Sequence, residues 1–398
     1  MAARDGGEVP IGRNFSAVAL PTVYRMAEKD ADLCAALRSA AGIFLGLRPK
    51  DEWPHAVSAE ALLGAARQAQ VMPIVCDAGL QVLPQSERPP FREAMLRSAA
   101  QSLRLVLTAA ETVGLLNAEG IETLLFKGPA WAQRLYGKAE LRDSVDIDLF
   151  VRRKDARRAV EILSANGFRS VSAPMVQEIL RRHYSLELAH PRTKVVIDLQ
   201  WSIANGYCRA PFNDDELLRR SEVIELDGRA FRTFDRAMML YLLVIHGAKN
   251  SWSELRALVD LSSALRKNEQ EWQTASEWLH RLGLSAMLAT GVQAANALLS
   301  TPIPSFIHAP KVSAQRTAAK VIDFWRRRGS CAGLPPAWDR FRWDLRMRRW
   351  PQKVSYIAFR MRPTKSDRSR ENGGTWLMIK RLMRSAAAWR PDKRLSNG

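Results

Sequence analysis

The feature that most constrains this chain is residues 145–151, where two aspartates alternate with apolar side chains. Alternation with a period of two predicts a β-strand that has one polar and one apolar face. Asp146 and Asp148 are therefore expected to point to the same side of the strand. Apolar side chains are expected to be buried on the opposite side: Val145, Ile147 and Leu149.

Two carboxylates this close together repel each other unless a cation lies between them. Oxygen ligands of this kind suit Mg²⁺, which proteins usually hold through one or two carboxylates together with substrate phosphates. A strand that presents Asp146 and Asp148 beside a glycine turn is suited to metal-assisted phosphoryl or nucleotidyl transfer. An isolated D-x-D motif is more often a solvated strand face, so the neighbouring segments decide its interpretation.

The segment before this strand favours a phosphate-binding role. Residues 121–126 are predicted to form a short buried strand that ends at Lys127 and Gly128, and Pro129 suits the first turn of a following helix. Backbone amides at a helix N-terminus can hold phosphate. Lys127 and Arg142 add positive charge. The predicted nucleotide-binding residues are therefore Lys127, Gly128 and Arg142.

A third acid lies in an apolar segment. Residues 184–189 and 194–199 are predicted as two strands joined by a turn, and Asp198 is the carboxylate of the second strand. A carboxylate in a buried strand needs a reason, such as a shared metal or a general-base role. We therefore predict that Asp146, Asp148 and Asp198 are the catalytic residues and the metal ligands.

These segments resemble a known family. The run LLFKGPAWAQRLYG followed by LRDSVDIDLFV is similar to the uncharacterised nucleotidyltransferase family, whose pattern is a hydrophobic strand, Lys-Gly, a short helix and then R-x-x-x-D-I-D-L. The later VVIDLQWSI resembles the acid-Leu-His-Trp segment of that family, with Asp198 as the acid, Trp201 as the Trp and Gln200 in place of the usual His. A more distant similarity is to AbiEii-type toxin nucleotidyltransferases, whose second glycine is Pro129 here.

The resemblance implies a polymerase β-like core, a bound Mg²⁺-nucleotide and transfer of NMP to a hydroxyl. The expected function is Mg²⁺-dependent transfer from an NTP, ATP in the first instance, to an unidentified acceptor that is a small molecule or a protein. One alternative is an RNA-end or tRNA-end nucleotidyltransferase of toxin type. A second alternative is a catalytically inactive protein of the same fold that binds a nucleotide or a partner.

Hydrophobic periodicity gives the expected organisation. Helical patterns cover residues 17–48, 57–70 and 91–116, and further helices follow Asp235, which is suited to cap the first of them. The expected class is α+β, with a polymerase β-like α/β core flanked by helical regions. Its expected parts are an N-terminal helical region, a nucleotidyltransferase core, a second helical region and a basic C-terminal region: residues 1–119, 120–235, 236–310 and 311–398.

Nearly all of the formal net charge of +19 lies in residues 311–398, which hold 23 Lys and Arg against 6 Asp and Glu. Such a region indicates a polyanionic partner such as RNA, nucleotide or an anionic membrane surface. The alternative is a solvated basic tail. Four tryptophans interleaved with arginines favour either a base-stacking surface or helix packing: Trp325, Trp338, Trp343 and Trp350.

Other polar residues have two interpretations. His246 is expected either in the core or in contact with substrate, and Asp143 is expected in a turn. No apolar run approaches the roughly 20 residues needed to span a bilayer, and the first residues lack the apolar core of a signal peptide. A cytoplasmic location is therefore expected.

Overall fold

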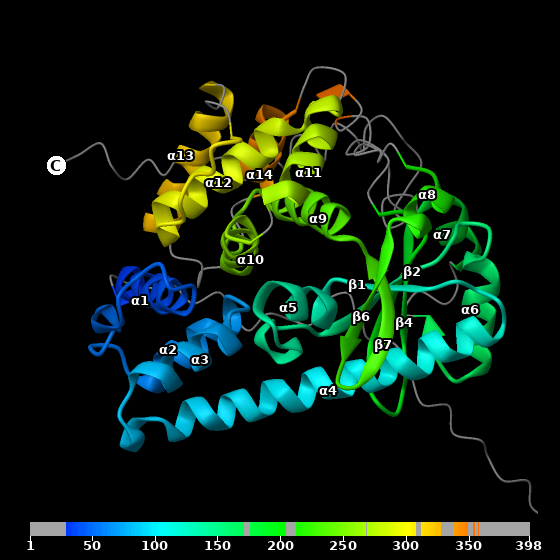
Figure 1. The fold of residues 1–398 in the computed structure, drawn as a ribbon, viewed down its shortest axis with the longest axis horizontal. Helices are drawn as coiled ribbons and strands as arrows, with labels where there is room; N and C mark the ends of the chain where they lie inside the picture. Colours follow the sequence, from blue (N-terminus) through cyan, green and yellow to red (C-terminus); the bar gives the residue numbers. More distant parts are fainter. Residues whose placement is uncertain are drawn as a thin grey trace, which may run out of the picture.

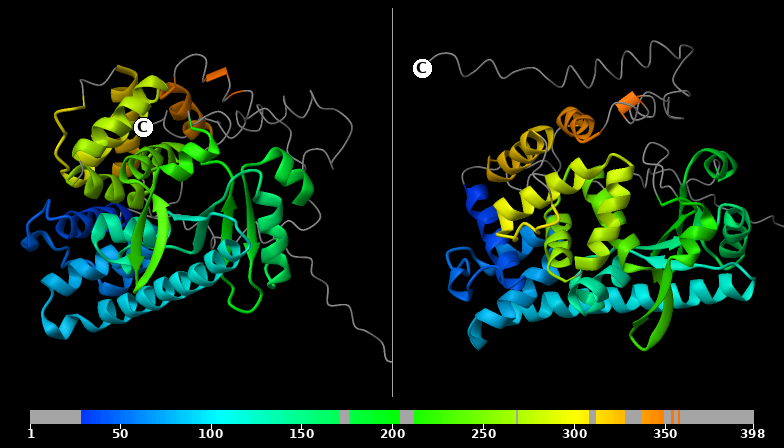
Figure 2. Two further views of the ribbon diagram at one scale, coloured as in Figure 1. Left: turned by 45° about the vertical axis from the view of Figure 1, so that its right-hand side comes forward. Right: turned by 45° about the horizontal axis from the view of Figure 1, so that its top comes forward.

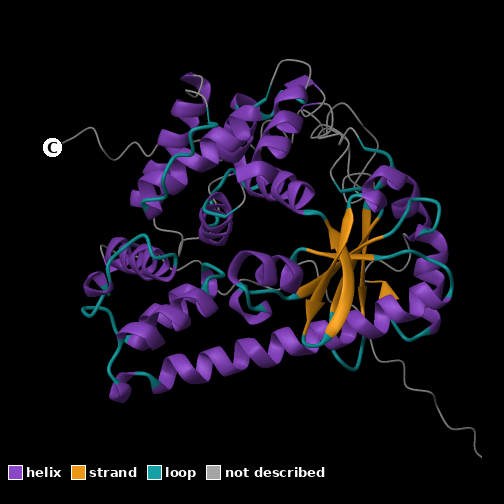
Figure 3. Cartoon of the chain, viewed as in Figure 1, coloured by secondary structure: helices purple, strands orange, loops and turns teal. Residues whose placement is uncertain are grey.

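The computed structural model describes residues 29–170, 176–203, 212–267, 269–307, 312–327, 337–348, 353–354 and 357. It confirms the predicted α+β class: the strands gather at one side of the molecule, among helices (Figure 3). No helix in these ranges is long and apolar enough to cross a membrane.

The N-terminal part is helical, as predicted. Its helices are α1 (Lys29–Phe44), α2 (Ala59–Gln68), α3 (Met72–Val82) and α4 (Pro89–Ala118). The helices predicted over residues 57–70 and 91–116 are confirmed, and the one predicted over residues 17–48 begins, within the described residues, at Lys29. Helix α4 runs from the other N-terminal helices to the sheet and lies along one face of it (Figures 1 and 2).

A five-stranded sheet forms the centre of the α/β core. Its strands have the order β1-β2-β5-β4-β3. Their bounds are β1 (Leu124–Phe126), β2 (Asp146–Phe150), β3 (Arg169–Ser170), β4 (Ser185–Ala189) and β5 (Val196–Gln200). Strands β2 and β5 pair in parallel, and the other neighbours pair antiparallel. The parallel register places Asp148 directly beside Asp198.

Helices and a hairpin complete this core. The helices are α5 (Gly128–Tyr136), α6 (Ala156–Ala165), α7 (Val176–Arg182) and α8 (Asp214–Arg219). The hairpin consists of β6 (Ser221–Leu226) and β7 (Arg229–Phe234), which the sequence analysis did not predict. Phe234 of β7 packs against Phe126 and Phe150, with ring centroids 5.4 and 5.6 Å apart. These aromatic contacts attach the hairpin to the sheet.

The two faces of the sheet differ in chemistry. Helices α4 and α6 cover one face, where Ile147 and Leu149 are buried as predicted. Val145 is an exception, because β2 begins only at Asp146 and the Val145 side chain is 76% exposed. The prediction that Val145 is buried was therefore wrong. The opposite face carries the aspartates.

The chain after the hairpin is helical again. Its helices are α9 (Arg236–Lys249), α10 (Leu255–Leu265), α11 (Glu269–Arg281), α12 (Ser285–Leu299), α13 (Val312–Arg327) and α14 (Ala337–Arg346). Asp235 caps α9 as predicted, because its carboxylate accepts a hydrogen bond from the backbone N–H of Met238 at 2.7 Å. Buried residues of α1–α3 and α9–α14 belong to one hydrophobic core. Trp325 and Trp343 are buried in it, which favours the packing alternative for these two tryptophans.

The Trp252 side chain, called here the tryptophan wedge, fills the turn between α9 and α10. Ser251 and Trp252 both have φ of +55°, and the Trp252 ring lies against Gly247 of α9 and Gly291 of α12. A Cβ atom at these glycines would come within 2.3 and 2.5 Å of the ring, so neither position has room for a side chain. Lys249 at the end of α9 and Arg256 near the start of α10, on either side of this corner, line the same pocket.

Candidate active site

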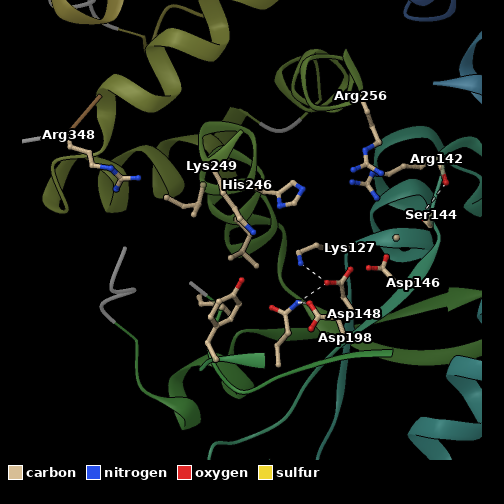
Figure 4. A pocket seen from close by; sticks show the side chains of 16 residues that line it. Lys127, Arg142, Ser144, Asp146, Asp148, Asp198, His246, Lys249, Arg256 and Arg348 are labelled. Carbon is tan, nitrogen blue, oxygen red and sulfur yellow. Dashed lines mark hydrogen bonds and ion pairs between the residues drawn. The ribbon is translucent and has the colours of Figure 1, made fainter. Parts of the chain in front are cut away.

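One pocket of about 260 Å³ lies between the polar face of the sheet and helices α9 and α10. All six site residues predicted from the sequence line it: Lys127, Gly128, Arg142, Asp146, Asp148 and Asp198 (Figure 4). They come from the turn between β1 and α5, the first residue of α5, the loop before β2, β2 itself and β5. The fold thus gathers residues that are up to 71 positions apart in the sequence around one cavity.

The three aspartates form one wall of the pocket. Asp146 and Asp148 lie on the same side of β2 because they are two residues apart, and Asp198 is the parallel neighbour of Asp148 on β5. One ammonium group and one amide group donate hydrogen bonds to Asp148 in this wall. Lys127 Nζ lies 2.5 Å from Asp148 Oδ1, and Gln200 Nε2 lies 2.8 Å from the same oxygen.

The crowding of these carboxylates affects their protonation. Burial, reinforced by the charge of Asp148, raises the pKa of Asp198 to about 6. Burial and Asp148 also raise the pKa of Asp146, whose carboxylate accepts no hydrogen bond from the described residues. Both shifts show that negative charge is costly at this wall. A bound cation would relieve that cost.

The N-terminus of α5 lies beside this wall. Lys127 and Gly128 have φ of +56° and +41°, so this turn requires a left-handed backbone at two consecutive residues. Glycine adopts that conformation without strain. Pro129 has no N–H, so the turn offers one fewer amide donor than a glycine-glycine turn. Ser144, whose hydroxyl would lie 3.5 Å from a Cβ at Gly128, lines the pocket beside the turn.

The Arg142 side chain is fixed by an ion pair with Asp260 of α10. Its Nε lies 3.0 Å from Oδ2 of Asp260 on α10, and the Tyr136 hydroxyl donates to Oδ1 of the same carboxylate. The Arg142 guanidinium also lies over the Trp131 ring, with its carbon 5.4 Å from the centroid. Arg142 therefore reaches the pocket as a fixed cation, with one side neutralised by Asp260.

The structure adds pocket residues that the sequence analysis did not single out. Arg256 of α10 lies beside Arg142 (Figure 4), and its Nη1 donates to the backbone carbonyl of Asp143 at 3.0 Å. Lys249 of α9 also faces the cavity. Both belong to amphipathic or apolar helices, where one basic residue carries no local signal. Asp143 does lie in a loop, and its carboxylate accepts a hydrogen bond from the N–H of Met72 at 3.1 Å.

His246 also lines this pocket, at the boundary between the helical core and the cavity. Burial, together with the positive charge of Lys127, lowers its pKa well below the ordinary value for histidine. The imidazole is therefore neutral near pH 7 and can accept or donate one hydrogen bond without adding charge. Its ring meets Trp131 edge-on, with centroids 6.5 Å apart.

The oxygen donors of this pocket suit Mg²⁺ that arrives with a nucleotide. Within the described ranges, no three His, Cys, Asp or Glu side chains are arranged as a ready ion-binding group. Mg²⁺ bound with a nucleotide needs only one or two carboxylates, because phosphate and water oxygens complete its shell. Asp146 and Asp148 meet that requirement, because both carboxylates line the pocket. The residues present therefore fit a Mg²⁺-nucleotide.

Comparison with known proteins identifies the family. No curated protein matches the sequence significantly. A crystal structure of an antigenic nucleotidyltransferase-like protein from Paracoccidioides brasiliensis matches with 18% identity and a TM-score of 0.28, over 48% of this chain and 91% of that one. Residues 55–300, more than half of the chain, match the sequence profile described as "Uncharacterised nucleotidyltransferase". The resemblance seen in the motifs is thus confirmed, and the chain belongs to this uncharacterised nucleotidyltransferase family.

Proposed function

We propose that the protein transfers NMP from an NTP to a hydroxyl acceptor in a Mg²⁺-dependent reaction. One observation carries the proposal: Asp146, Asp148 and Asp198 form one wall of a pocket whose other walls supply a helix N-terminus and several cations. Family membership supports nucleotidyl transfer as the reaction class. The raised pKa values of Asp146 and Asp198 in a pocket are also typical of functional carboxylates.

In this proposal the chain has three tasks. Asp146 and Asp148 would hold Mg²⁺, which would neutralise phosphate charge and orient the triphosphate. The Gly128 amide, Lys127 and the Arg142–Arg256 pair would bind phosphate oxygens. Fixed cations of this kind stabilise the charge that moves onto the leaving pyrophosphate.

Asp198 would act on the acceptor. The acceptor oxygen forms a bond to the α-phosphorus, the bond from that phosphorus to the bridging oxygen breaks, and pyrophosphate leaves with the electron pair. The hydroxyl proton passes to Asp198, whose pKa of about 6 leaves it mostly ionised near pH 7 and yet basic enough to accept a proton. The attacking and leaving oxygens are roughly in line, so the acceptor enters opposite the pyrophosphate.

The acceptor is proposed to be a small molecule or a protein, and ATP is the proposed donor. The basic segment 311–398 favours RNA as an alternative acceptor, but most of that segment lies outside the described residues. An inactive protein of the same fold is the remaining alternative. The presence of Asp146, Asp148 and Asp198 in one pocket argues against it.

The test is incubation of the protein with each α-labelled NTP, Mg²⁺ and a cell extract, followed by separation of RNA, protein and small molecules. We expect label in the small-molecule or protein fraction, and no label with Asp146→Asn or Asp148→Asn. Label in RNA would instead establish the RNA-end alternative. Absence of label in every fraction, together with absence of Mg²⁺-dependent nucleotide binding, would contradict nucleotidyl transfer.

A further inference from the structure

Gln200 occupies a central position that the mechanism above does not use. It is the last residue of β5, two residues after Asp198, and its side chain therefore lies on the same face of the sheet. The residue is only 3% exposed. A buried primary amide must find partners for its polar atoms, because an unsatisfied one destabilises the fold.

The amide nitrogen of Gln200 contacts both neighbouring carboxylates. Nε2 lies 2.8 Å from Asp148 Oδ1 and 2.5 Å from Asp198 Oδ2. A primary amide nitrogen carries two hydrogens, so it can donate one to each carboxylate at the same time. Ionised carboxylates only accept hydrogen bonds, so the nitrogen of the amide, rather than its oxygen, must face them.

These contacts use one oxygen of each carboxylate and leave the other. Asp148 Oδ1 accepts hydrogen bonds from both Lys127 and Gln200, and Asp198 Oδ2 accepts one from Gln200. Asp148 Oδ2 accepts no hydrogen bond from the described residues. Asp198 Oδ1 is buried and likewise has no hydrogen-bond partner among them. Asp148 therefore has one oxygen held by the protein and one oxygen available for a ligand, whereas Asp198 is held through Oδ2 and its Oδ1 is covered.

We propose that Gln200 is a positioning residue, which fixes Asp148 and Asp198 relative to each other across β2 and β5. By holding one oxygen of each, it directs Asp148 Oδ2 toward a divalent cation and keeps the Asp198 carboxylate in the pocket wall, where it acts on the acceptor hydroxyl. The inference rests on the proposed function. It assigns the two carboxylates different partners although they are neighbours in the sheet and share the same donor.

Other side chains at this position cannot do the same. The Nε2 of a neutral histidine has at most one hydrogen, so it can donate to only one of the two carboxylates. Methionine has nearly the length of glutamine but donates none. The series Gln200, Gln200→His and Gln200→Met therefore removes the donated hydrogen bonds stepwise while the volume of the side chain stays similar.

The first readout needs no turnover. Mn²⁺ binding to the full-length protein is measured by electron paramagnetic resonance in the presence of α,β-methylene ATP, which the enzyme cannot cleave at the α-phosphorus. Partners that orient a ligating carboxylate typically contribute about 10- to 100-fold to metal affinity. We expect Gln200→Met to weaken Mn²⁺ binding by about tenfold or more, with Gln200→His in between.

The second readout separates kcat from KM. Loss of a hydrogen bond to a charged group costs free energy equivalent to a rate factor of about 10- to 100-fold. We therefore expect kcat of Gln200→Met to fall by that factor. The KM for the NTP should change by less than about threefold, because the phosphate-binding residues are untouched. Ser263→Ala is the matched control. It removes a buried hydrogen bond of 2.7 Å to the Leu135 carbonyl, away from the carboxylates, and should leave both readouts unchanged.

Unchanged Mn²⁺ affinity and unchanged kcat in Gln200→Met would overturn the inference, even if the wild type is active. If Gln200→Met does not fold, Gln200→His decides the question alone. Wild-type Mn²⁺ affinity and wild-type kcat in that variant would overturn the inference. Failure of the proposed function looks different, because the wild type would then bind no Mn²⁺-nucleotide, or would bind it equally well after Asp148→Asn. That result would remove the metal site and this role of Gln200 together.

Discussion

At the scale of single residues, the site is defined by charges that are buried beside one another. Asp146, Asp148 and Asp198 share one wall, where Lys127 and Gln200 donate to Asp148 and Gln200 also donates to Asp198. Repulsion among buried carboxylates raises the free energy of the folded protein. Donors and a bound cation lower it, so metal binding and stability are expected to be coupled at these residues.

The first prediction concerns that coupling. Asp146→Asn and Asp148→Asn should keep the fold, because they relieve repulsion and asparagine retains an oxygen that accepts hydrogen bonds. A ligand at a hundredfold excess over its Kd stabilises a protein by about 2.7 kcal/mol. Thermal melting should therefore show stabilisation of the wild type by Mg²⁺-ATP and little or none for either variant. Equal stabilisation of all three proteins would refute the metal assignment.

The second prediction concerns pH. Burial and Asp148 raise the pKa of Asp198 to about 6, whereas an aspartate in an unfolded chain titrates near ~3.9. Between these two pH values Asp198 is protonated in the folded protein and ionised in the unfolded chain. The folded state therefore gains unfolding free energy from this proton. That contribution is complete below about pH 4 and is lost as the pH rises through about 6.

Metal-free wild type should therefore lose roughly 2–3 kcal/mol of unfolding free energy relative to Asp198→Asn between about pH 4 and pH 7. Urea unfolding in EDTA at several pH values measures this difference. A constant difference across the range would show that the pKa of Asp198 is not raised. Asp198→Asn should also cut kcat severely and change nucleotide affinity only modestly, as expected for a group that acts on the acceptor.

At the scale of elements, the corner between α9 and α10 places the cations of the pocket. Trp252 is fully buried between Gly247 and Gly291, and its Nε1 donates to the Met287 carbonyl at 2.9 Å. The wedge fixes where α9 ends and α10 begins. The positions of Lys249 and Arg256 follow from that corner.

The third prediction tests the tryptophan wedge with two glycine substitutions that should change the free energy of unfolding in opposite directions. Gly247→Ala places a Cβ 2.3 Å from the Trp252 ring, and overpacking of this kind costs typically 1–3 kcal/mol of stability. Gly114→Ala in α4 is the control, because nothing lies within 4 Å of its Cβ and alanine favours helices by up to ~1 kcal/mol. Chemical denaturation should show a loss for the first and a gain for the second. Equal effects would mean that Trp252 does not constrain α9.

At the scale of the whole molecule, the pocket is shared between the nucleotidyltransferase core and the helices. The loop before β2 is held from two sides, because Asp143 accepts from Met72 of α3 and its carbonyl accepts from Arg256 of α10. Arg142 of the same loop pairs with Asp260 of α10. The N-terminal and C-terminal helices also share one hydrophobic core. The site therefore depends on packing across most of the described chain.

The fourth prediction concerns the ion pair between core and helices. Asp260 is 2% exposed and is the partner of both Arg142 and Tyr136. Asp260→Ala would leave the buried Arg142 cation unpaired, which typically costs 3–5 kcal/mol of stability. Tyr136→Phe removes one hydrogen bond but leaves the ion pair, so it should cost only about 1 kcal/mol. Urea unfolding compares them, and similar losses would show that the ion pair itself contributes little.

The fifth prediction concerns the basic segment, whose residues after Pro363 lie outside the described ranges and hold 9 Lys and Arg against 3 Asp and Glu. If this segment recruits RNA, truncation after Pro363 should weaken RNA binding and flatten its salt dependence, because fewer counterions are released. Transfer to a small acceptor should survive. Fluorescence anisotropy at several salt concentrations is the measurement, and no RNA binding by the intact protein at low salt would exclude recruitment.

Local patterns were sufficient for part of this protein. The alternation over residues 145–151 predicted β2 and the shared side of Asp146 and Asp148, because strand periodicity depends only on neighbouring residues. Asp235 predicted the start of α9 for the same local reason. The motif around Lys127 also identified the family. These features need no knowledge of what packs against the segment.

Only the tertiary structure decided which distant residues meet. The parallel register of β2 and β5 placed Asp198 and Gln200 beside Asp148, and the Trp252 corner brought Arg256 to the pocket. Local sequence could not show that Val145 precedes the strand and stays exposed. Strand register, helix crossing and burial arise from contacts between residues far apart in the chain, so a single segment carries no periodic signal for them.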